Sequence, residues 1–390
     1  MGISNCHNVE DFRKLAKKRL PDGIFWYMEG GSDDEVTLRS NTTAFDDYAL
    51  VPDALVDVSN IDLSTRVLGV DMALPFYLSP SGGTRLFHHH KEAAVARAAA
   101  KAGIIYGQST MSTSSIEEVG AASSGPKMFQ IYSLKDKELT RDFVARAKAA
   151  NFDALCLTVD SSISGNRERD LRTGLNFPPK IRLSTIAGFA SKPRWLWNFM
   201  LNPEFTLSNI QSDALGDGMN VFELAHHLMD VSVTWDDAKI IRDLWDGPFA
   251  IKGIQSVADA KRAVDIGATA IIVSTHGGRQ LDGASAMVHR IAPIRQAVGN
   301  KIEIIADSGI RRGSHVLKAL ALGADACSFA RPYIYGLAAG GEAGVTRVVD
   351  LISAEIERDM GLLGVTKTTD ITGRHVVRAD GLPISQDAHP

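Results

Sequence analysis

A histidine and an arginine stand three residues apart in the segment STHGGRQLD, residues 274–282, directly after the apolar run 270–273. Imidazole exchanges protons near neutral pH, and a guanidinium fork binds carboxylates through paired hydrogen bonds. A histidine can also be purely structural, and an arginine can be only a surface charge. The segment therefore indicates a base, His276, beside an anion clamp, Arg279, provided that other reactive groups converge on it.

Short apolar runs rich in branched or aromatic residues predict eight strands. Alanine-rich amphipathic segments lie between most of them, and four of these segments end at Gly103, Asn151, Gly267 or Gly323, which are typical residues at helix C-termini. Alternation of strand and helix predicts parallel strands joined by right-handed crossovers. The expected strands are residues 76–78, 104–106, 128–132, 154–159, 249–252, 270–273, 302–306 and 326–330.

Eight such strands can close into a (β/α)8 barrel, an α/β fold, whereas a doubly wound open sheet is the alternative. Polar residues recur after many different strands, not at one switch point, which favours the barrel. We expect a helical segment at 1–60 that closes the barrel, with its first helix capped by Asn8 and ended near Pro21. The barrel itself spans 61–375 with a long insertion at about 170–235, and a tail follows at 376–390.

Nearly every expected strand ends in a side chain that can form hydrogen bonds. Buried polar groups are costly unless they are paired, so a full ring of them indicates a site at the C-terminal mouth of the barrel. These strand-end residues are Ser79, Pro80, Ser81, Gly82, Gln108, Ser109, Gln130, Tyr132, Thr158, Asp160, Lys252, Ser274, His276, Asp307, Ser308, Gly309, Ala330 and Arg331.

The last two strands point to a phosphorylated ligand. The segment DSGIRRG, residues 307–313, precedes a helix, and Arg331 follows the eighth strand. Loops in these positions are the usual phosphate site of such barrels, although a glycine turn with solvated arginines is the alternative. Lys252, after the fifth strand, suits either a Schiff-base lysine or a cation beside an electron-rich cofactor edge.

These motifs resemble the FMN-dependent L-2-hydroxy acid dehydrogenases and oxidases, the family of glycolate oxidase, L-lactate dehydrogenase and mandelate dehydrogenase. The resemblance runs nearly end to end, through LAKKRLPDGIFWYMEGGSDDE, FQIY, LTVD, IKGI, STHGGRQLD, DSGIRRG, ALALGA and ARPY. STHGGRQLD is its most specific part. The resemblance implies FMN as the cofactor and oxidation of an L-2-hydroxy acid, with L-lactate favoured, to the 2-keto acid.

The resemblance also implies a role for each matching residue. His276 is the expected base and Asp160 stabilises its imidazolium, while either hydride transfer or a carbanion route stays open. The expected substrate-binding residues are Arg167, Arg279, Tyr27, Tyr132, Gly82 and Met111. The expected flavin contacts are Ser79, Pro80, Ser81, Gly82, Ser109, Gln130, Thr158, Lys252 and Ser274, and the phosphate contacts are Asp307, Ser308, Gly309, Ile310, Arg311, Ala330 and Arg331.

Four positions bear on substrate identity or depart from the family pattern. Thr275 replaces an asparagine, Met111 occupies a position often held by tryptophan, and Ala330 replaces a glycine before the phosphate arginine. Gly82 stands where some members with small substrates carry alanine, which leaves room for a side chain larger than methyl. Mandelate-type or longer 2-hydroxy acids are therefore the alternative substrates.

Composition excludes other classes of partner. A net charge of -4 gives no reason to expect nucleic acid, and no GxGxxG fingerprint follows a strand, which argues against NAD. Cys6, Cys156 and Cys327 are expected to be buried thiols. The first residues lack the apolar core of a signal peptide, and no apolar run could span a bilayer. We expect a cytoplasmic protein.

The insertion contains KPRWLWNFML, residues 192–201, which places aromatic residues beside basic ones. This composition is typical of a segment at a membrane surface, although a helix packed on the barrel or on another subunit would also fit. We expect peripheral contact with the inner face of the cell membrane through Trp195, Trp197 and Phe199. Family members of this kind pass electrons to a quinone or cytochrome; an oxidase that reduces O₂ is the rival, and a tetramer or octamer is expected.

Two further readings carry less weight. His88, His89 and His90 are adjacent, as are His226 and His227, and adjacent histidines seldom converge on one metal, so no metal site is expected. A Schiff-base aldolase acting through Lys252 is a distant alternative. A non-catalytic barrel does not explain why the base, the clamp and both tyrosines occur together.

Overall fold

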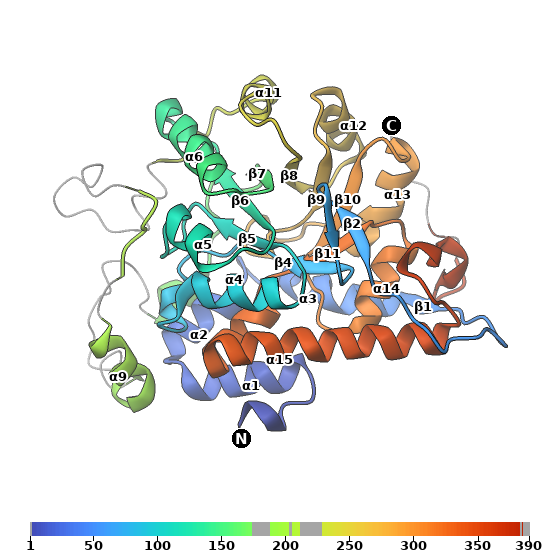
Figure 1. Cartoon of the computed structure of the whole chain (residues 1–390), viewed down its shortest axis with the longest axis horizontal. Helices are drawn as coiled ribbons and strands as arrows, with labels where there is room; N and C mark the ends of the chain where they lie inside the picture. Colours follow the sequence, from blue (N-terminus) through green and yellow to red (C-terminus); the bar gives the residue numbers. More distant parts are fainter. Residues whose placement is uncertain (1, 174–187, 203–204, 211–227, 383, 385–390) are drawn as a thin grey trace.

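Eight parallel strands close into a barrel in the part of the chain that the structure, a computed structural model, describes: residues 2–173, 188–202, 205–210, 228–382 and 384 (Figure 1). Their order around the barrel is β10-β11-β4-β5-β6-β7-β8-β9. The expected (β/α)8 fold is confirmed, and the open doubly wound sheet is excluded. The strands are β4 (Phe76–Leu78), β5 (Tyr106–Ser109), β6 (Lys127–Tyr132), β7 (Ala154–Thr158), β8 (Phe249–Ile254), β9 (Ala270–Val273), β10 (Glu303–Asp307) and β11 (Ala326–Phe329).

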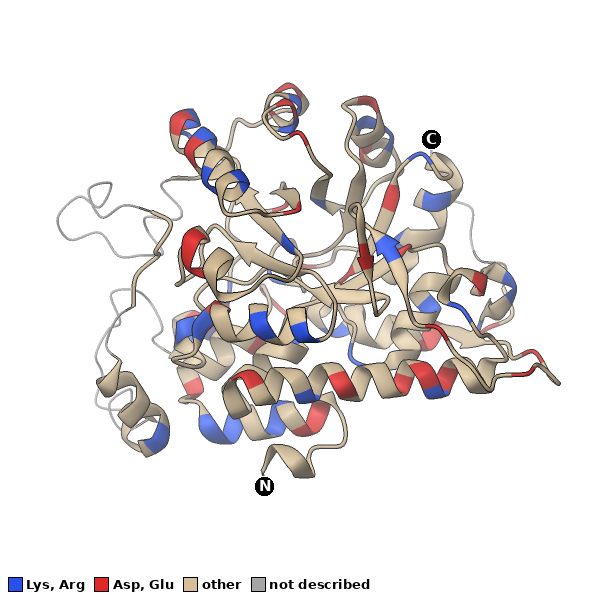
Figure 2. Ribbon diagram, viewed as in Figure 1, with Lys and Arg blue, Asp and Glu red and all other residues tan. Residues whose placement is uncertain are grey.

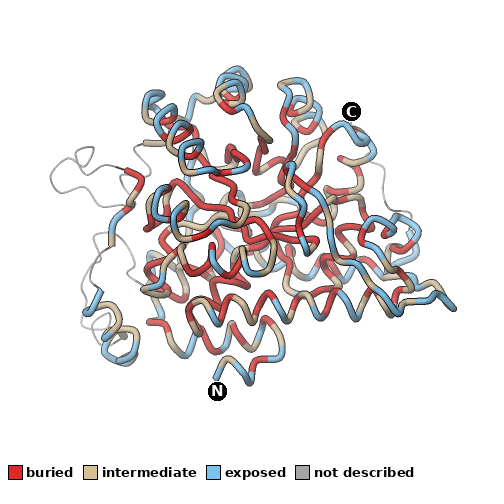
Figure 3. The backbone as a smooth tube through the Cα atoms, in the orientation of Figure 1, coloured by how far each residue is buried: buried red, intermediate tan, exposed pale blue. Residues whose placement is uncertain are grey.

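The strands are short and buried on both faces, which explains why they read as continuous apolar runs (Figure 3). Two strands match the expected bounds, four differ by one residue at one or both ends, and β5 and β8 differ by more. β5 begins at Tyr106, although the Ile105 carbonyl still accepts a hydrogen bond from Leu78 N. β8 continues to Ile254 through a register shift, because Gly253 has a φ of 104° and interrupts the extended backbone.

Helices surround the barrel and follow the strands in alternation. All four predicted helix ends, at Gly103, Asn151, Gly267 and Gly323, have a positive φ, as a left-handed C-terminal residue requires. These outer helices are α4 (Lys91–Lys101), α5 (Ile116–Ala122), α6 (Lys137–Ala149), α11 (Trp235–Asp243), α12 (Val257–Asp265), α13 (Val288–Val298), α14 (Gly313–Ala321) and α15 (Arg331–Leu363). Figure 2 shows acidic and basic residues interspersed on them.

The N-terminal segment lies along α15, the long helix at the base of Figure 1. Its first helix is capped by the Asn8 side chain, which accepts from Asp11 N, and ends at Arg19, as predicted. Its last strand pairs with β12, within the expected tail. The segment comprises η1 (Ile3–Asn5), α1 (Val9–Arg19), α2 (Asp22–Glu29), α3 (Val36–Thr43), η2 (Ala44–Asp47) and β1 (Tyr48–Leu50), and its pairing strand is β12 (Val376–Arg378). After the segment, β2 (Thr65–Val67) and β3 (Val70–Met72) pair with each other.

The long excursion between β7 and β8 carries α7 (Glu168–Thr173), α9 (Pro193–Leu201) and α11. Three stretches of the excursion, 174–187, 203–204 and 211–227, lie outside the described part of the chain, and the last of them includes His226 and His227. In Figure 1, α9 lies at the edge of the molecule, away from the barrel axis. Among the described residues, no helix combines the length and apolar character needed to cross a bilayer. All three cysteines are buried free thiols, as predicted.

Candidate active site

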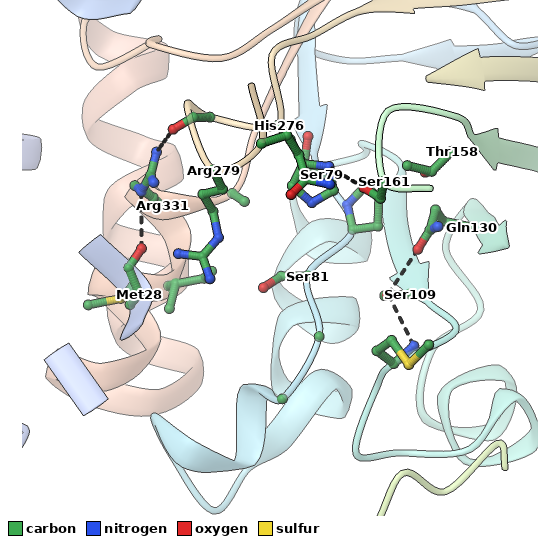
Figure 4. A pocket seen from close by; sticks show the side chains of 18 of the residues that line it. Met28, Ser79, Ser81, Ser109, Gln130, Thr158, Ser161, His276, Arg279 and Arg331 are labelled. Atoms are coloured by element: carbon green, nitrogen blue, oxygen red, sulfur yellow. Dashed lines mark hydrogen bonds between the residues drawn. The ribbon is translucent and has the colours of Figure 1, made fainter. Parts of the chain in front are cut away.

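One pocket at the C-terminal mouth of the barrel collects most of the residues predicted from the strand ends (Figure 4). All of the predicted substrate-binding residues and His276 line it. Of the other predicted residues, four are not among its lining residues: Gln108, Asp160, Ser274 and Ile310. Asp160 contacts His276, Ser274 joins a buried polar cluster, and Gln108 and Ile310 are fully buried.

His276 is held by three contacts at the end of β9. Its Nδ1 lies 2.9 Å from Asp160 Oδ1 and 3.2 Å from Ser161 Oγ, and its backbone N–H donates to Ser274 Oγ. Its φ is 54°, a left-handed value that is uncommon for a non-glycine residue and clusters at functional sites. With Nδ1 directed at the carboxylate, Nε2 is the nitrogen left to accept a proton from a ligand in the pocket.

Asp160 stays charged in this arrangement. Burial alone would raise its pKa, but the His276 imidazole and the Lys252 ammonium outweigh burial and lower the pKa below its ordinary value. Asp160 Oδ2 has no hydrogen-bond partner among the described residues. A buried carboxylate with an unused oxygen is well suited to stabilise a positive charge on the adjacent imidazole.

The two glycines after His276 make room for neighbouring elements. A Cβ at Gly277 would lie 2.6 Å from Arg331 Nη1, and a Cβ at Gly278 would lie 2.5 Å from Leu38 N on α3. Both glycines also have positive φ values of 66° and 74°. The close packing of Arg331 and of the N-terminal segment against this loop therefore requires glycine at both positions.

Arg279 and Arg167 flank the Tyr27 ring, with their guanidinium carbons 5.2 Å and 6.0 Å from its centroid. Arg279 Nη1 also donates to the Tyr27 and Gly30 carbonyls, which fixes the guanidinium. Burial, and then the Arg167 charge, lower the pKa of Arg279 to about 10. The pocket thus holds two partly buried cations whose mutual repulsion an anion would relieve, so the geometry supports a carboxylate clamp.

The two tyrosines remain neutral phenols at physiological pH. Burial raises the pKa of Tyr27 and of Tyr132, and for Tyr132 the Asp160 charge raises it further. A neutral phenol can donate a hydrogen bond, which is the role expected of both side chains toward a substrate anion.

Lys252 lies in a buried polar cluster instead of pointing freely into the pocket. Its Nζ donates to Asp307 Oδ2 at 2.5 Å and to Ser274 Oγ at 2.8 Å, and Asp307 also accepts from Ser79 and Ser328. Although burial opposes it, the Asp307 charge raises the pKa of Lys252. A Schiff-base lysine must be neutral to attack a carbonyl, so this ion pair disfavours the aldolase alternative.

The flavin contacts predicted after β5 to β7 form one wall of the pocket. Ser109 Oγ donates to Gln130 Oε1 at 2.8 Å and accepts from Met111 N, as Figure 4 shows. Gln130 Nε2 and Thr158 Oγ1 are buried and have no hydrogen-bond partner among the described residues. Two orphaned polar atoms on one wall indicate that a polar ligand completes it.

At the other end of the pocket, two arginines gather where a phosphate was predicted. Arg331 donates to the Met28, Gly30 and Gly277 carbonyls, and Arg311 and Gly309 line the pocket beside it. Burial lowers the pKa of Arg331, and the nearby Arg311 charge contributes to the shift. Ala330, which replaces the glycine of the family pattern, also lines the pocket and is the N-cap residue of α15.

Two side chains predicted to contact phosphate serve the loop instead. Ser308 Oγ accepts from the backbone N–H groups of Thr275 and Gly277, and the Asp307 carboxylate is occupied by Lys252 and serines. Their backbone groups remain candidates for the phosphate, but their side chains hold β9, β10 and the His276 loop together.

Several residues in the pocket wall or beside it were not anticipated from the sequence. Ser161 contacts both Asp160 and His276, and its place directly after Asp160 was the available signal. Asp170 Oδ2 lies 3.5 Å from Arg167 Nε. Burial raises the pKa of Asp170, although the Arg279 and Arg167 charges oppose this shift. An apolar group closes the pocket from the loops and gave no local signal: Phe87, Phe205, Leu207 and Met229.

The chain is similar to known proteins over most of its length. The family model described as FMN-dependent dehydrogenase matches residues 16–378. A protein named L-lactate dehydrogenase from Caulobacter vibrioides (strain NA1000 / CB15N) is 41% identical over 368 residues, covering 93% of this chain and 96% of its own length. A protein named L-lactate oxidase from Nostoc sp. (strain PCC 7120 / SAG 25.82 / UTEX 2576) is 40% identical, covering 95% and 97%.

A solved structure resembles the whole chain as well. The crystal structure of the monotopic membrane protein (S)-mandelate dehydrogenase superposes with a TM-score of 0.92 at 35% sequence identity, covering 96% of this chain and 100% of that chain.

The residues present fit FMN. The orphaned Gln130 and Thr158 atoms form a polar wall that would hold a ring with hydrogen-bonding edges, and the buried Lys252 cation would stabilise negative charge on the ring when it is reduced. Arg311, Arg331 and the start of α15 provide the positive end that a phosphate needs.

Proposed function

This chain belongs to the family of FMN-dependent dehydrogenases, whose members related to it oxidise L-2-hydroxy acids, and we propose L-lactate as its preferred substrate. The observation that carries the proposal is the convergence of a base and an anion clamp on one pocket. His276 with Asp160 faces the same space as Arg279 and Arg167. Two of the related proteins, from Caulobacter vibrioides and Nostoc, are named for lactate.

In the proposed reaction, Arg279 and Arg167 bind the substrate carboxylate and Tyr27 and Tyr132 donate hydrogen bonds to the bound acid. These contacts hold the 2-hydroxy carbon beside His276. His276 Nε2 then accepts the proton that the substrate loses. Asp160, charged and hydrogen-bonded to Nδ1, stabilises the imidazolium that forms. When bound, FMN supplies the two-electron acceptor for this oxidation.

The substrate side chain would lie beside Gly82 and Met111. A Cβ at Gly82 would be 2.9 Å from both the Cβ and the carbonyl oxygen of Met111, so the two residues determine together how much space remains. Phe87, Phe205, Leu207 and Met229 extend this apolar wall. The wall favours a second candidate substrate, an L-2-hydroxy acid with a larger side chain such as L-mandelate, which the resemblance to (S)-mandelate dehydrogenase also supports.

Anaerobic titration of the FMN-loaded enzyme tests both candidates. L-lactate, glycolate, L-mandelate and longer 2-hydroxy acids are added separately, and loss of the oxidised flavin absorbance is recorded, with D-lactate as the matched control. We expect L-lactate to reduce the flavin at the highest kcat/KM. A higher value for L-mandelate would establish the second candidate, and no reduction by any L-acid would contradict the assignment.

We propose a quinone or cytochrome as the electron acceptor, with O₂ as the alternative that the lactate oxidase relative represents. After anaerobic reduction by substrate, reoxidation is timed separately with air-saturated buffer and with a soluble quinone analogue. Faster reoxidation by the quinone analogue is expected, whereas turnover at full rate on O₂ alone would identify an oxidase.

We also propose that α9 contacts a membrane surface. Trp197, Met200 and Leu201, spaced three and four residues apart, are exposed by 63%, 64% and 61% and form one apolar face. Trp195 faces the other way: its Nε1 donates to the Leu86 carbonyl, and its ring stacks on Phe199. The membrane contact predicted for Trp195, Trp197 and Phe199 is therefore reassigned mainly to Trp197, Met200 and Leu201.

We also propose that the chain forms a homo-oligomer, a tetramer in the first instance. The exposed face of α9 is then available to a second copy of the chain as well as to a membrane. Light scattering of the wild type and of Trp197→Glu separates the two uses of α9. Loss of vesicle binding with an unchanged mass supports the membrane role, and a fall in mass assigns the face to the oligomer.

A further inference from the structure

Three consecutive histidines lie together at the start of α4, outside the active-site pocket. The ring centroids of His88, His89 and His90 are 4.3–4.5 Å apart in every pairing. One nitrogen from each ring can be chosen so that all three lie within 4.8 Å of one another. Adjacent residues usually direct their side chains apart, so this convergence was not expected from the sequence.

The backbone around the cluster is folded tightly enough to bring the rings together. His88 N donates to the Thr84 carbonyl, Lys91 N donates to the His88 carbonyl, and Lys91 has a φ of 52°. A left-handed lysine at the first turn of a helix is a strained conformation, and such strain is kept where the surrounding structure requires it.

A kink in α15 provides the space for the rings. Gly340 and Gly341 depart from helical geometry, and Gly341 has a φ of 61°. A Cβ at Gly341 would lie 2.8 Å from His90 Nδ1 and 2.9 Å from His88 Cε1, so only glycine lets the helix pass this close to the rings. The loop after β4 and the C-terminal helix therefore meet at the histidine cluster.

All three nitrogens that a metal would use need a free lone pair, and neutral imidazole provides one. His89 Nδ1 is buried and has no hydrogen-bond partner among the described residues.

We propose that His88, His89 and His90 form a binding site for a divalent late transition-metal ion, with Zn²⁺ as the reference ion. Two imidazole nitrogens on a tetrahedral Zn²⁺ at 2.0–2.1 Å are about 3.3 Å apart, so each pair of nitrogens closes by at most about 1.5 Å on binding. Three neutral nitrogen donors suit Zn²⁺, Cu²⁺ or Ni²⁺ better than Mg²⁺ or Ca²⁺, which prefer oxygen ligands.

Binding requires two local adjustments. His88 Nδ1 accepts a hydrogen bond from His90 N, and coordination through Nδ1 replaces this bond while coordination through the other nitrogen requires the opposite tautomer. The Arg85 and Arg19 cations repel a bound metal ion. The free energy of the direct metal–nitrogen bonds therefore has to be larger than this repulsion. Water completes the coordination on the exposed His90 side, where Glu342 lines the same hollow.

Metal binding by the tag-free, FMN-loaded full chain tests the proposal without using activity. After treatment with a chelator, the protein is dialysed against ZnCl₂ and bound zinc is measured by mass spectrometry. One Zn²⁺ per chain is expected. Each of His88→Gln, His89→Gln and His90→Gln is expected to weaken zinc binding at least about tenfold. Loss of a residue that only supports a metal ligand already lowers metal affinity by about this factor. His289→Gln, which removes a histidine paired with Asp47, is the matched control and leaves binding unchanged.

X-ray absorption at the zinc edge of the wild-type protein provides a second measurement that does not depend on whether the variants fold. Three imidazole nitrogens at about 2.0–2.1 Å support the site. The proposal is overturned if the wild type binds no zinc above background, if all three glutamine variants bind as tightly as the wild type, or if the absorption spectrum shows fewer than three imidazoles.

Discussion

At the scale of single residues, Thr275 explains how the chain departs from its family pattern without losing the active-site loop. Its Oγ1 accepts from Asn41 Nδ2 at 2.8 Å and donates to Ser308 Oγ at 3.2 Å, and the side chain is buried. The hydroxyl thus links α3 to the loop after β10, directly beside His276. Such a three-residue network cannot be recognised from the substitution alone, because Asn41 and Ser308 are far away in the sequence.

Thr275→Val keeps the shape of the side chain and removes both hydrogen bonds. Because Asn41 Nδ2 is left buried without its acceptor, we expect a loss of about 1–3 kcal/mol in the free energy of unfolding. Urea unfolding of the FMN-loaded protein measures it. Thr275→Ser retains the hydroxyl and is expected to lose less; equal stability of the valine variant and the wild type would contradict the role given to this network.

Arg279→Lys tests the carboxylate clamp. Lysine cannot satisfy the Tyr27 and Gly30 carbonyls and a carboxylate at once with the fixed geometry of a guanidinium fork. Loss of one charge-assisted pair, about 1.5–3 kcal/mol, lowers kcat/KM by about 10–100-fold, mainly through a higher KM. Steady-state kinetics with L-lactate at matched FMN content measure this, and an unchanged KM would show that Arg279 does not bind the substrate.

At the scale of elements, the strands and helix ends were predictable because they obey local rules. Buried parallel strands read as apolar runs, and the four glycine or asparagine residues at helix ends were found in left-handed conformation. The direction in which α9 faces was not predictable. The sequence showed aromatic residues beside basic ones, but only the contacts of Trp195 with Leu86 and of Phe199 with Arg85 show which face of the helix packs on the protein.

Trp197→Glu places a charge on the exposed face of α9 without breaking its packing. If this face enters the membrane interface, the variant should sediment much less with vesicles of phosphatidylethanolamine and phosphatidylglycerol than the wild type does. Ile240→Glu, an equally exposed apolar position on α11, is the matched control. Equal sedimentation of Trp197→Glu and the wild type would remove the case for α9 as a membrane contact.

At the scale of the whole molecule, the buried pair Lys252–Asp307 joins β8 to β10, the two strands that flank β9 in the barrel. The ring of polar strand ends indicated a site at the mouth of the barrel, and most of the predicted residues do line it. Their division of labour could not be predicted, because Asp307, Ser274 and Ser308 use their side chains to hold neighbouring strands. That assignment depends on distances between segments that the sequence does not encode locally.

Asp307→Asn leaves the Lys252 charge buried without its partner and should lower the free energy of unfolding by about 3–5 kcal/mol at neutral pH. The pKa of Asp307 is lowered in the folded state, mainly because the Lys252 charge overcomes the effect of burial. Its stabilisation is therefore fully present above the unfolded value of about 3.9 and is lost as pH falls through the folded value.

Denaturant unfolding across this acid range, with saturating FMN, measures both effects. The asparagine variant should lack the part of the acid dependence that Asp307 causes. Asp71→Asn, which breaks an exposed pair with Arg66, is the control and should change stability by no more than about 0.5 kcal/mol. A similar small change for Asp307→Asn would show that the pair does not stabilise the barrel.

We propose that His276, supported by Asp160, accepts the substrate proton beside the flavin site. Stopped-flow reduction of the FMN-loaded enzyme by L-lactate, without oxygen, tests it most directly. His276→Gln and Asp160→Asn should bind FMN with an unchanged oxidised spectrum, and each should slow flavin reduction by about 100-fold or more. Reduction of the flavin in His276→Gln at the wild-type rate would show that His276 is not the base.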